Sequence, residues 1–168
     1  QEKLVRTGAG DGNVSFDNPR AVTLMCRLMD VYDFYYEILE REGFDGKGGP
    51  IHAVCNVSVN NAFAWEPAHE FAHLATGSDY QFMTTNVIAH EYTHAVTRSI
   101  YSPVGSPETL ALGEALSDIF AELAEDYGDG RLDGDCDWLN DIRNFADPAA
   151  STEDEGSGSP AHASYYND

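Results

Sequence analysis

Apolar side chains recur at spacings of three and four along three segments of the chain, which is the periodicity of amphipathic helices. The first segment follows the capping pair Asn18-Pro19 and runs to about Glu42, where Gly43 ends it. The second segment begins near residue 84 or 85 and ends before the polar loop 102–106, and the third covers residues 107–127. The sequence therefore predicts three helices. The apolar stripe of the first consists of Val22, Met25, Cys26, Met29, Tyr32, Tyr36 and Leu39.

Between the first and second helices the pattern changes to a period of two, which is typical of a half-buried strand. Residues 51–59 alternate apolar and polar side chains over most of their length and predict one strand. Residues 60–65 predict an edge strand after a bend, and residues 80–83 predict a shorter strand. Together with the helices, these strands predict an α+β fold in which a small twisted sheet packs on a helix.

The composition limits the classes of partner. The chain has 168 residues and a formal charge of −20, from 29 acidic and 9 basic side chains, which excludes a nucleic-acid partner bound through bulk charge. Apolar residues make up 42% of the chain and aromatic residues 11%, enough for the core of one globular domain with an acidic surface. No run approaches the ~18 consecutive apolar residues that a membrane-spanning helix needs, so no membrane span is predicted. The sequence predicts no particular oligomeric state.

The pentapeptide His90-Glu91-Tyr92-Thr93-His94 matches the pattern H-E-x-x-H within the second predicted helix. A spacing of four residues places both imidazoles on one helix face, one turn apart, where they can share a tetrahedral zinc ion. Glu91 then flanks the ion and can accept a proton from a water molecule whose pKa the ion has lowered. The alternative is a helix with two incidental histidines and an exposed glutamate.

A second copy of the same pattern occupies residues 69–73, between a predicted strand and the turn at Gly77-Ser78. Its neighbours suit a short strand at least as well as a helix. On a strand, His69 and His73 would lie about 13 Å apart at ~3.3 Å per residue, too far to chelate one ion. We therefore predict that the copy at residues 90–94 holds the metal.

A third protein ligand is expected from the next helix, where Glu114 and Asp118 share one face. Antiparallel packing of the two helices could bring Glu114 onto the metal and leave Asp118 to hydrogen-bond the outer nitrogen of a ligand histidine. Three protein ligands and one open position are typical of a catalytic zinc site. The alternative is an ordinary acidic helix face in a very acidic protein.

Four separated segments resemble one protein family, in the same order along the chain. VIAHEYTHAVT at residues 87–97 and GEALSDIF at residues 113–120 are similar to its two zinc-binding segments, and 114 − 94 gives its spacing of twenty positions. Asn60-Asn61-Ala62-Phe63 is similar to its substrate-binding edge strand, and Arg143 before Asp147-Pro148 matches its conserved arginine. The family is that of the thermolysin-like zinc metallopeptidases (gluzincins), and the His₂Glu ligand set is the one known from thermolysin itself.

The resemblance implies a thermolysin-like catalytic domain, with a small twisted mixed sheet packed on the active-site helix. It implies a zinc-dependent endopeptidase that hydrolyses peptide bonds of a peptide or protein substrate through a metal-activated water. The implied zinc ligands are His90, His94 and Glu114. The implied catalytic residues are Glu91, Asp118 and Arg143, and the implied substrate contacts are Asn61 and Ala62. Because the family is generally exported, a secreted or cell-surface location is expected.

The chain also departs from the family pattern. Family members carry an oxyanion-stabilising histidine in a C-terminal helical domain, and this sequence ends at Asp168, before that region. A family tyrosine with a related role would align near Gly105, so it is either missing or supplied by Tyr101 after a loop shift. Residues 1–168 are therefore expected to form a truncated metallopeptidase domain, with a flexible loop or linker at residues 149–160. The alternative function is a catalytically silent zinc-binding interaction module derived from a metallopeptidase.

Calcium is the second ion that the sequence suggests. Residues 133–137 present alternating carboxylates, which include Asp137, and Glu125 matches a family calcium ligand. Asn86 stands where the family has an acid, and Leu139 replaces another. A solvated acidic turn is the alternative to a calcium site at Glu125 and Asp137. An acidic calcium-dependent adhesion domain with incidental histidines is a further alternative for the whole chain.

Overall fold

The computed structural model describes most of the first 130 residues. It covers residues 18–58, 61–68, 71–77, 80–101, 107–128 and 130, with the side chains of 65–68 and 71 outside the description. The described elements are the helices α1 (Pro19–Glu37), α2 (Thr85–Ile100) and α3 (Pro107–Gly128), the short 3₁₀ helix η1 (Tyr80–Met83), and the strands β1 (Ile51–Val54), β2 (Ala62–Ala68) and β3 (Phe71–Thr76). The three predicted helices are all present. The expected linker at residues 149–160 lies outside the described residues.

The start of α1 follows the predicted capping signal, but its end does not. The Asn18 side chain accepts a hydrogen bond from the Arg20 backbone N–H at 3.0 Å, and Pro19 is the first helical residue. The helix ends at Glu37 and not near Glu42, because Glu40 adopts a left-handed backbone with φ 51°. The N–H of Arg41 then donates to the carbonyl of Tyr35, six positions earlier, at 2.9 Å, so the chain folds back over the end of the helix.

The buried face of α1 is not the predicted stripe. The buried residues of α1 are Leu24, Leu28, Val31, Phe34 and Tyr35. In the predicted stripe, Met29 is 59% exposed and Tyr36 54% exposed. Both faces of this helix are apolar enough to fit a helical period, so spacing alone could not choose between them.

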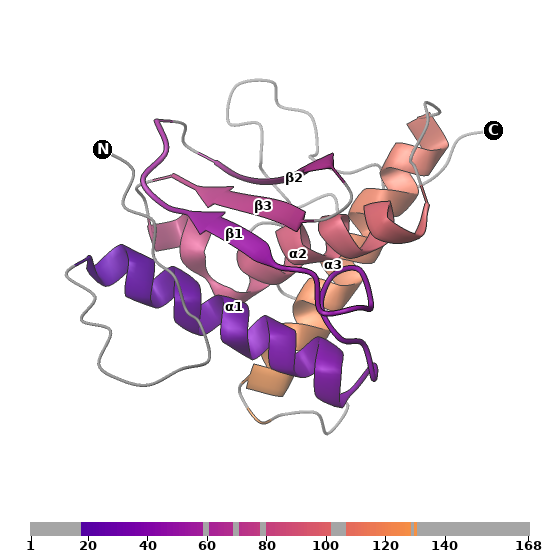
Figure 1. Cartoon of the computed structure of the whole chain (residues 1–168), viewed down its shortest axis with the longest axis horizontal. Coiled ribbons are helices and arrows are strands. Elements are labelled where there is room, and N and C mark those ends of the chain that lie inside the picture. Colours follow the sequence, from indigo (N-terminus) through magenta and orange to yellow (C-terminus); the bar gives the residue numbers. More distant parts are fainter. Residues whose placement is uncertain are drawn as a thin grey trace, which may run out of the picture.

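The sheet is mixed, as expected. Its order is β1-β3-β2, with β3 parallel to β1 and antiparallel to β2 (Figure 1). The predicted edge strand at residues 60–65 is found as Ala62–Ala68. The strand predicted at residues 51–59 is shorter, since it ends at Val54 and Asn56 turns the chain with φ 63°.

The prediction of a strand at residues 80–83 is wrong. Tyr80–Met83 form η1, which immediately precedes the N-cap Thr84 of α2. Met83 is 2% exposed, and η1 contacts both α1 and α2. Four residues are too few for a period of two to be distinguished from a single 3₁₀ turn.

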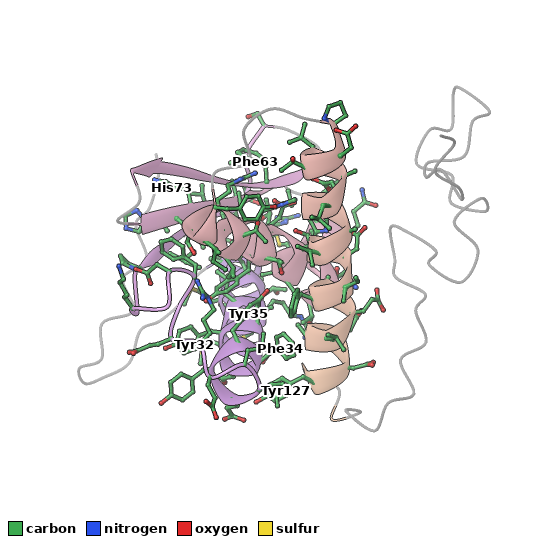
Figure 2. All side chains as sticks on the ribbon, turned by 90° about the vertical axis from the view of Figure 1, so that its right-hand side faces the viewer. Tyr32, Phe34, Tyr35, Phe63, His73 and Tyr127 are labelled. Atoms are coloured by element: carbon green, nitrogen blue, oxygen red, sulfur yellow. The ribbon has the colours of Figure 1, made fainter. Side chains whose placement is uncertain are left out.

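The core lies where α1, α2, α3 and the inner face of the sheet meet. Figure 2 shows Phe34, Tyr35 and Tyr127 between α1 and α3. Tyr35 is 1% exposed, packs against the Tyr92 ring at 5.0 Å, and shares a hydrogen bond of 2.7 Å with the Thr93 hydroxyl. Leu74 and Ala72 bring β3 into the same cluster. The helix α2 thereby packs against α3, α1 and β2. Among the described residues, no helix is both long enough and apolar enough to span a membrane.

Candidate metal centre

Two imidazoles project from the same face of α2. Thr84 caps this helix by accepting a hydrogen bond from the Val87 N–H at 3.2 Å. His90 and His94 then lie one turn apart, with their ring centroids 4.6 Å from each other and their planes at 86°. Both side chains are largely buried, at 14% and 12% exposure. The helix therefore fixes two potential metal ligands in one place.

Glu114 on α3 lies against both imidazoles. Its Oε2 is 3.3 Å from Nε2 of His90, and its Oε1 is 3.3 Å from Nε2 of His94. One ligand atom from each of the three residues lies within 4.8 Å of the others. Two imidazole nitrogens and one carboxylate are a donor set that suits zinc and other divalent transition ions. The structure thus brings together the three residues that the sequence proposed as ligands.

The outer nitrogen of each histidine has its own partner on α3. Nδ1 of His90 lies 2.8 Å from Oδ1 of Asp118, whose side chain is 7% exposed. Nδ1 of His94 lies 3.1 Å from the hydroxyl of Ser117, which is fully buried. The Asp118 contact was expected from the sequence, but Ser117 was missed. Its position three residues after Glu114, on the same side of a helix, is the signal that could have indicated it.

The charges around His90 and Glu114 support each other. Burial alone lowers the pKa of His90, but hydrogen bonds to Asp118 and Glu114 and the charge of Glu91 outweigh it and raise the pKa to about 9. Hydrogen bonds from His90 and His94 hold the pKa of Glu114 well below its usual range. Without a metal, His90 is therefore a cation at neutral pH between two carboxylates, in the place where a metal cation would supply the positive charge.

Glu91 lies beside this group in a different environment. Burial raises the pKa of its carboxyl, although the two histidines and a hydrogen bond from the Ala64 backbone oppose the increase. Arg98, also on α2, donates to the carbonyl of Ala64 at 2.7 Å. Hydrogen bonds between the Ala64 backbone and the side chains of Glu91 and Arg98 therefore hold β2 next to α2. A carboxylate with a raised pKa is better suited to accept and hold a proton at neutral pH.

The predicted substrate contacts lie at the start of β2. Ala62 is 4% exposed, and its N–H donates to the side-chain oxygen of Asn61 at 2.9 Å. The Asn61 carbonyl accepts a hydrogen bond from Gly77 at 2.8 Å. Asn61 itself is exposed. Arg143 lies outside the described residues.

The proposed calcium region contains an amide where a carboxylate was expected. Asn86 is 1% exposed, and its Nδ2 donates to Glu122 at 2.7 Å and to Glu125 at 3.2 Å. Glu122 is 4% exposed and was not identified from the sequence. In this arrangement a neutral donor of the protein lies between two carboxylates. Asp137 lies outside the described residues, and no calcium site is shown.

The copy of the H-E-x-x-H pattern at residues 69–73 falls largely in the sheet. Its last three residues begin β3, and His73 is in register with Trp65 of β2 and His52 of β1. His69 and Glu70 lie outside the described residues. The described part of this copy is extended, as expected, and does not present a helical pair of ligands.

Comparison with known proteins places the chain in a family. The model of the thermolysin metallopeptidase catalytic domain matches residues 6–98, which are 93 of the 168 residues. A helix with paired histidines under a small mixed sheet defines a zincin-like domain. This chain belongs to the thermolysin metallopeptidase family.

Individual relatives agree with this assignment. An extracellular metalloprotease of Pectobacterium carotovorum subsp. carotovorum is 26% identical over 185 residues, which cover 98% of this chain and 52% of the relative. Neutral protease B of Bacillus subtilis (strain 168) is 32% identical over 118 residues, which cover 68% of this chain and 22% of the relative. The chain thus spans about half the length of the first relative and less of the second.

A solved structure supports the fold. The precursor of protealysin, a metalloproteinase from Serratia proteamaculans, superimposes with a TM-score of 0.68 at 22% identity, over 84% of this chain and 48% of that chain. The prediction of a thermolysin-like α+β fold is therefore confirmed.

Proposed function

We propose that this chain is the zinc-binding part of an endopeptidase that hydrolyses peptide bonds in peptides or proteins. The observation that carries the proposal is the position of the Glu114 carboxylate, 3.3 Å from the Nε2 atoms of both His90 and His94. These three residues would hold zinc and leave its fourth coordination position open, as in a catalytic site. A structural site would instead be closed by a fourth protein ligand. Among the described residues, this is the one group of three or more His, Cys, Asp or Glu residues placed to share an ion.

The chemistry follows from the residues around that ion. A bound zinc ion supplies Lewis acidity, which polarises a carbonyl group and lowers the pKa of a water molecule. Glu91 would accept the proton that the water loses and pass it to the leaving amine. The raised pKa of Glu91 supports this role, because a more basic carboxylate holds the proton between the two transfers.

The second group of residues would keep the ligands in position. Asp118 at 2.8 Å and Ser117 at 3.1 Å each contact the nitrogen of a histidine that faces away from Glu114. Such contacts fix the tautomer and the ring orientation, so that Nε2 of each imidazole is directed at the ion. Asp118 would also increase the basicity of His90 as a ligand.

The substrate would bind along β2. In the described sheet this strand has one neighbour, β3, and its other edge can pair with an extended peptide. The backbone of Ala64 lies against Glu91, which places the strand next to the reacting groups. Asn61 and Ala62 would contact the peptide backbone, and Arg143 would orient the substrate carbonyl, as the family resemblance implies.

The relatives also suggest where the protein acts. Their names include an extracellular metalloprotease and, in Staphylococcus epidermidis, an extracellular elastase. A secreted or cell-surface location is proposed on this basis.

The decisive experiment compares hydrolysis with zinc content. Wild type, Glu91→Gln and His94→Gln are loaded with zinc, and cleavage of casein and of a furylacryloyl dipeptide is measured beside the metal content. We expect wild type to bind one tight zinc and hydrolyse both substrates. Glu91→Gln should keep that zinc and lose about 10²–10⁴-fold in kcat, because the proton acceptor is gone. His94→Gln should lose the tight zinc as well as the activity.

Two results would contradict the proposal. Stoichiometric zinc without hydrolysis in wild type and in Glu91→Gln would favour a silent zinc-binding module. Calcium without any bound zinc would favour an adhesion domain. Glu108→Gln, at the exposed start of α3, is a matched control that should change neither zinc content nor hydrolysis.

A further inference from the structure

A second pair of imidazoles lies on the sheet, away from the H-E-x-x-H helix. His52 on β1 and His73 on β3 are direct partners in the parallel register of these strands. Their neighbours along the strands, Ile51 and Ala53 on β1 and Ala72 and Leu74 on β3, pack into the core that the helices form. Because side chains alternate between the two faces of a strand, His52 and His73 share the opposite, outer face.

The two histidine pairs have similar geometry. The ring centroids of His52 and His73 lie 5.1 Å apart, with their planes at 79°. The corresponding values for His90 and His94 are 4.6 Å and 86°. Both pairs are therefore close, edge-to-face imidazoles. Two such rings can each direct one nitrogen at a common ion at about 2.0–2.1 Å, the usual zinc–nitrogen distance.

We propose that His52 and His73 form a second, surface site for a divalent transition-metal ion such as Zn²⁺, Ni²⁺ or Cu²⁺. Imidazole suits these ions, whereas Mg²⁺ and Ca²⁺ prefer oxygen ligands. The two ligands come from neighbouring hydrogen-bonded strands, so that the register of the sheet holds them in place before any ion binds. This site does not depend on the proposed peptidase activity.

The surroundings of the pair agree with a metal site that is weaker than the first. Partial burial and the nearby His52 lower the pKa of His73, which favours the neutral imidazole that binds metals. His52 is exposed, so that an ion can reach it from solvent. Two protein ligands give less affinity than the three of the first site, and water would complete the coordination. Figure 2 shows His73 on the sheet, well separated from α3 and therefore from Glu114.

The test is a metal titration of the whole chain after treatment with a chelator. Zinc chloride is titrated by calorimetry into wild type, His52→Gln, His73→Gln and His94→Gln. We expect wild type to bind one tight and one weaker equivalent. His52→Gln and His73→Gln should each lose the weaker equivalent and keep the tight one, and His94→Gln should do the reverse. A wild type that lacked the tight equivalent but kept a weaker one sensitive to His52→Gln and His73→Gln would count against the first site and leave this proposal intact.

Copper provides a second readout, which reports the ligand atoms and not the affinity for zinc. With Cu²⁺ added to His94→Gln, the electron paramagnetic resonance spectrum should show nitrogen hyperfine structure, and His52→Gln in the same background should abolish it. The chain has six histidines, so a weak equivalent that persists in both His52→Gln and His73→Gln would place the ion elsewhere and overturn the proposal. A wild type that binds the tight equivalent and no weaker one would also overturn it. Circular dichroism of each variant checks that the fold is retained.

Discussion

The hydroxyl of Ser117 lies 3.1 Å from Nδ1 of His94, and Ser117 is fully buried between α2 and α3. Asp118, the next residue, makes the equivalent contact with Nδ1 of His90 at 2.8 Å. Two successive residues of α3 thus hold the two histidines of α2. The hydroxyl can accept a hydrogen bond from Nδ1–H of His94 and so leave the Nε2 lone pair free for a metal.

Replacing Ser117 by alanine should weaken zinc binding without abolishing it. The ring of His94 would lose the contact that fixes its tautomer, and loss of such outer contacts typically costs 10–100-fold in metal affinity. Because a neutral hydroxyl contributes less than a carboxylate, we expect about tenfold for Ser117→Ala and a larger loss for Asp118→Asn. Competition with a fluorescent zinc chelator measures both affinities.

Two further variants show whether Ser117 acts by orienting the His94 ring or only by filling space between the helices. Ser117→Cys fills the buried space but hydrogen-bonds weakly, so its affinity should lie near that of Ser117→Ala. Ser58→Ala, at an exposed position outside the three helices, should bind zinc like wild type. Wild-type affinity in Ser117→Ala would show that Ser117 does not position His94.

Zinc binding should depend on pH through His90. The pKa of His90 is raised to about 9 in the metal-free protein, and the ion must displace that proton. The affinity should therefore tighten by about tenfold per pH unit between pH 7 and pH 9 and level off above. Chelator competition at several pH values measures the slope. Asp118→Asn removes one cause of the raised pKa and should move the levelling to lower pH; an affinity independent of pH above 7 would contradict the assignment.

The same shift predicts how the metal-free protein responds to alkali. A histidine whose pKa is higher in the folded than in the unfolded state stabilises the fold fully below its unfolded pKa of about 6.5. That contribution is lost as pH rises through the folded value of about 9. The melting temperature of the metal-free protein should thus fall between these pH values through His90. Zinc-loaded protein, in which the proton is already displaced, should lack this part of the decline.

The core of the candidate site could be predicted from the sequence because its geometry is local. The positions of His90 and His94 in one helix place the imidazoles together whatever the rest of the chain does. Glu114 needed a further step, the antiparallel packing of α3 on α2, which the short connection between the two helices suggested and the spacing typical of the family supported. For Ser117 the signal was its position three residues after Glu114, which can be used only once Glu114 is known to face the histidines.

The fold was predictable where a pattern had one interpretation. The start of α2 follows from its cap Thr84, and α3 runs from Pro107 to Gly128, close to the predicted 107–127. The face of α1 that is buried was not predictable, since two faces of this helix are apolar. Only the packing against α2 and α3 decides which of them is buried. Whether residues 80–83 form a strand or a 3₁₀ turn is likewise decided by packing, through the burial of Met83.

Two alanine substitutions test the rotation of α1. Leu24 is 2% exposed, whereas Met29, on the predicted stripe, is 59% exposed. Leu24→Ala should lower the free energy of unfolding by about 2–5 kcal/mol, because it leaves a cavity in the core. Met29→Ala should change it by no more than about 0.5 kcal/mol. Urea denaturation measures both; a larger loss for Met29→Ala would mean that the other face is covered in solution.

A substitution of the buried residue Asn86 tests whether calcium binds at this position. It donates hydrogen bonds to Glu122 at 2.7 Å and Glu125 at 3.2 Å, so Asn86→Asp would replace a donor by a third carboxylate. In a chelator, this variant should lose at least about 1–3 kcal/mol of stability, because buried groups lose their partners. Calcium should then stabilise it, by about 2.7 kcal/mol at a concentration 100-fold above its Kd.

Asn86→Ala is the matched control, because it removes the same hydrogen bonds without adding a charge. It should be destabilised with or without calcium and show no larger calcium response than wild type. Thermal unfolding in a chelator and in calcium chloride compares the three proteins. If calcium stabilised wild type as much as Asn86→Asp, the Asn86 amide would not be replacing a bound cation. Glu125 would then be a calcium ligand with Asn86 beside it. A gain confined to Asn86→Asp would instead show that these two helices need no ion at this position, because the Asn86 amide satisfies both carboxylates.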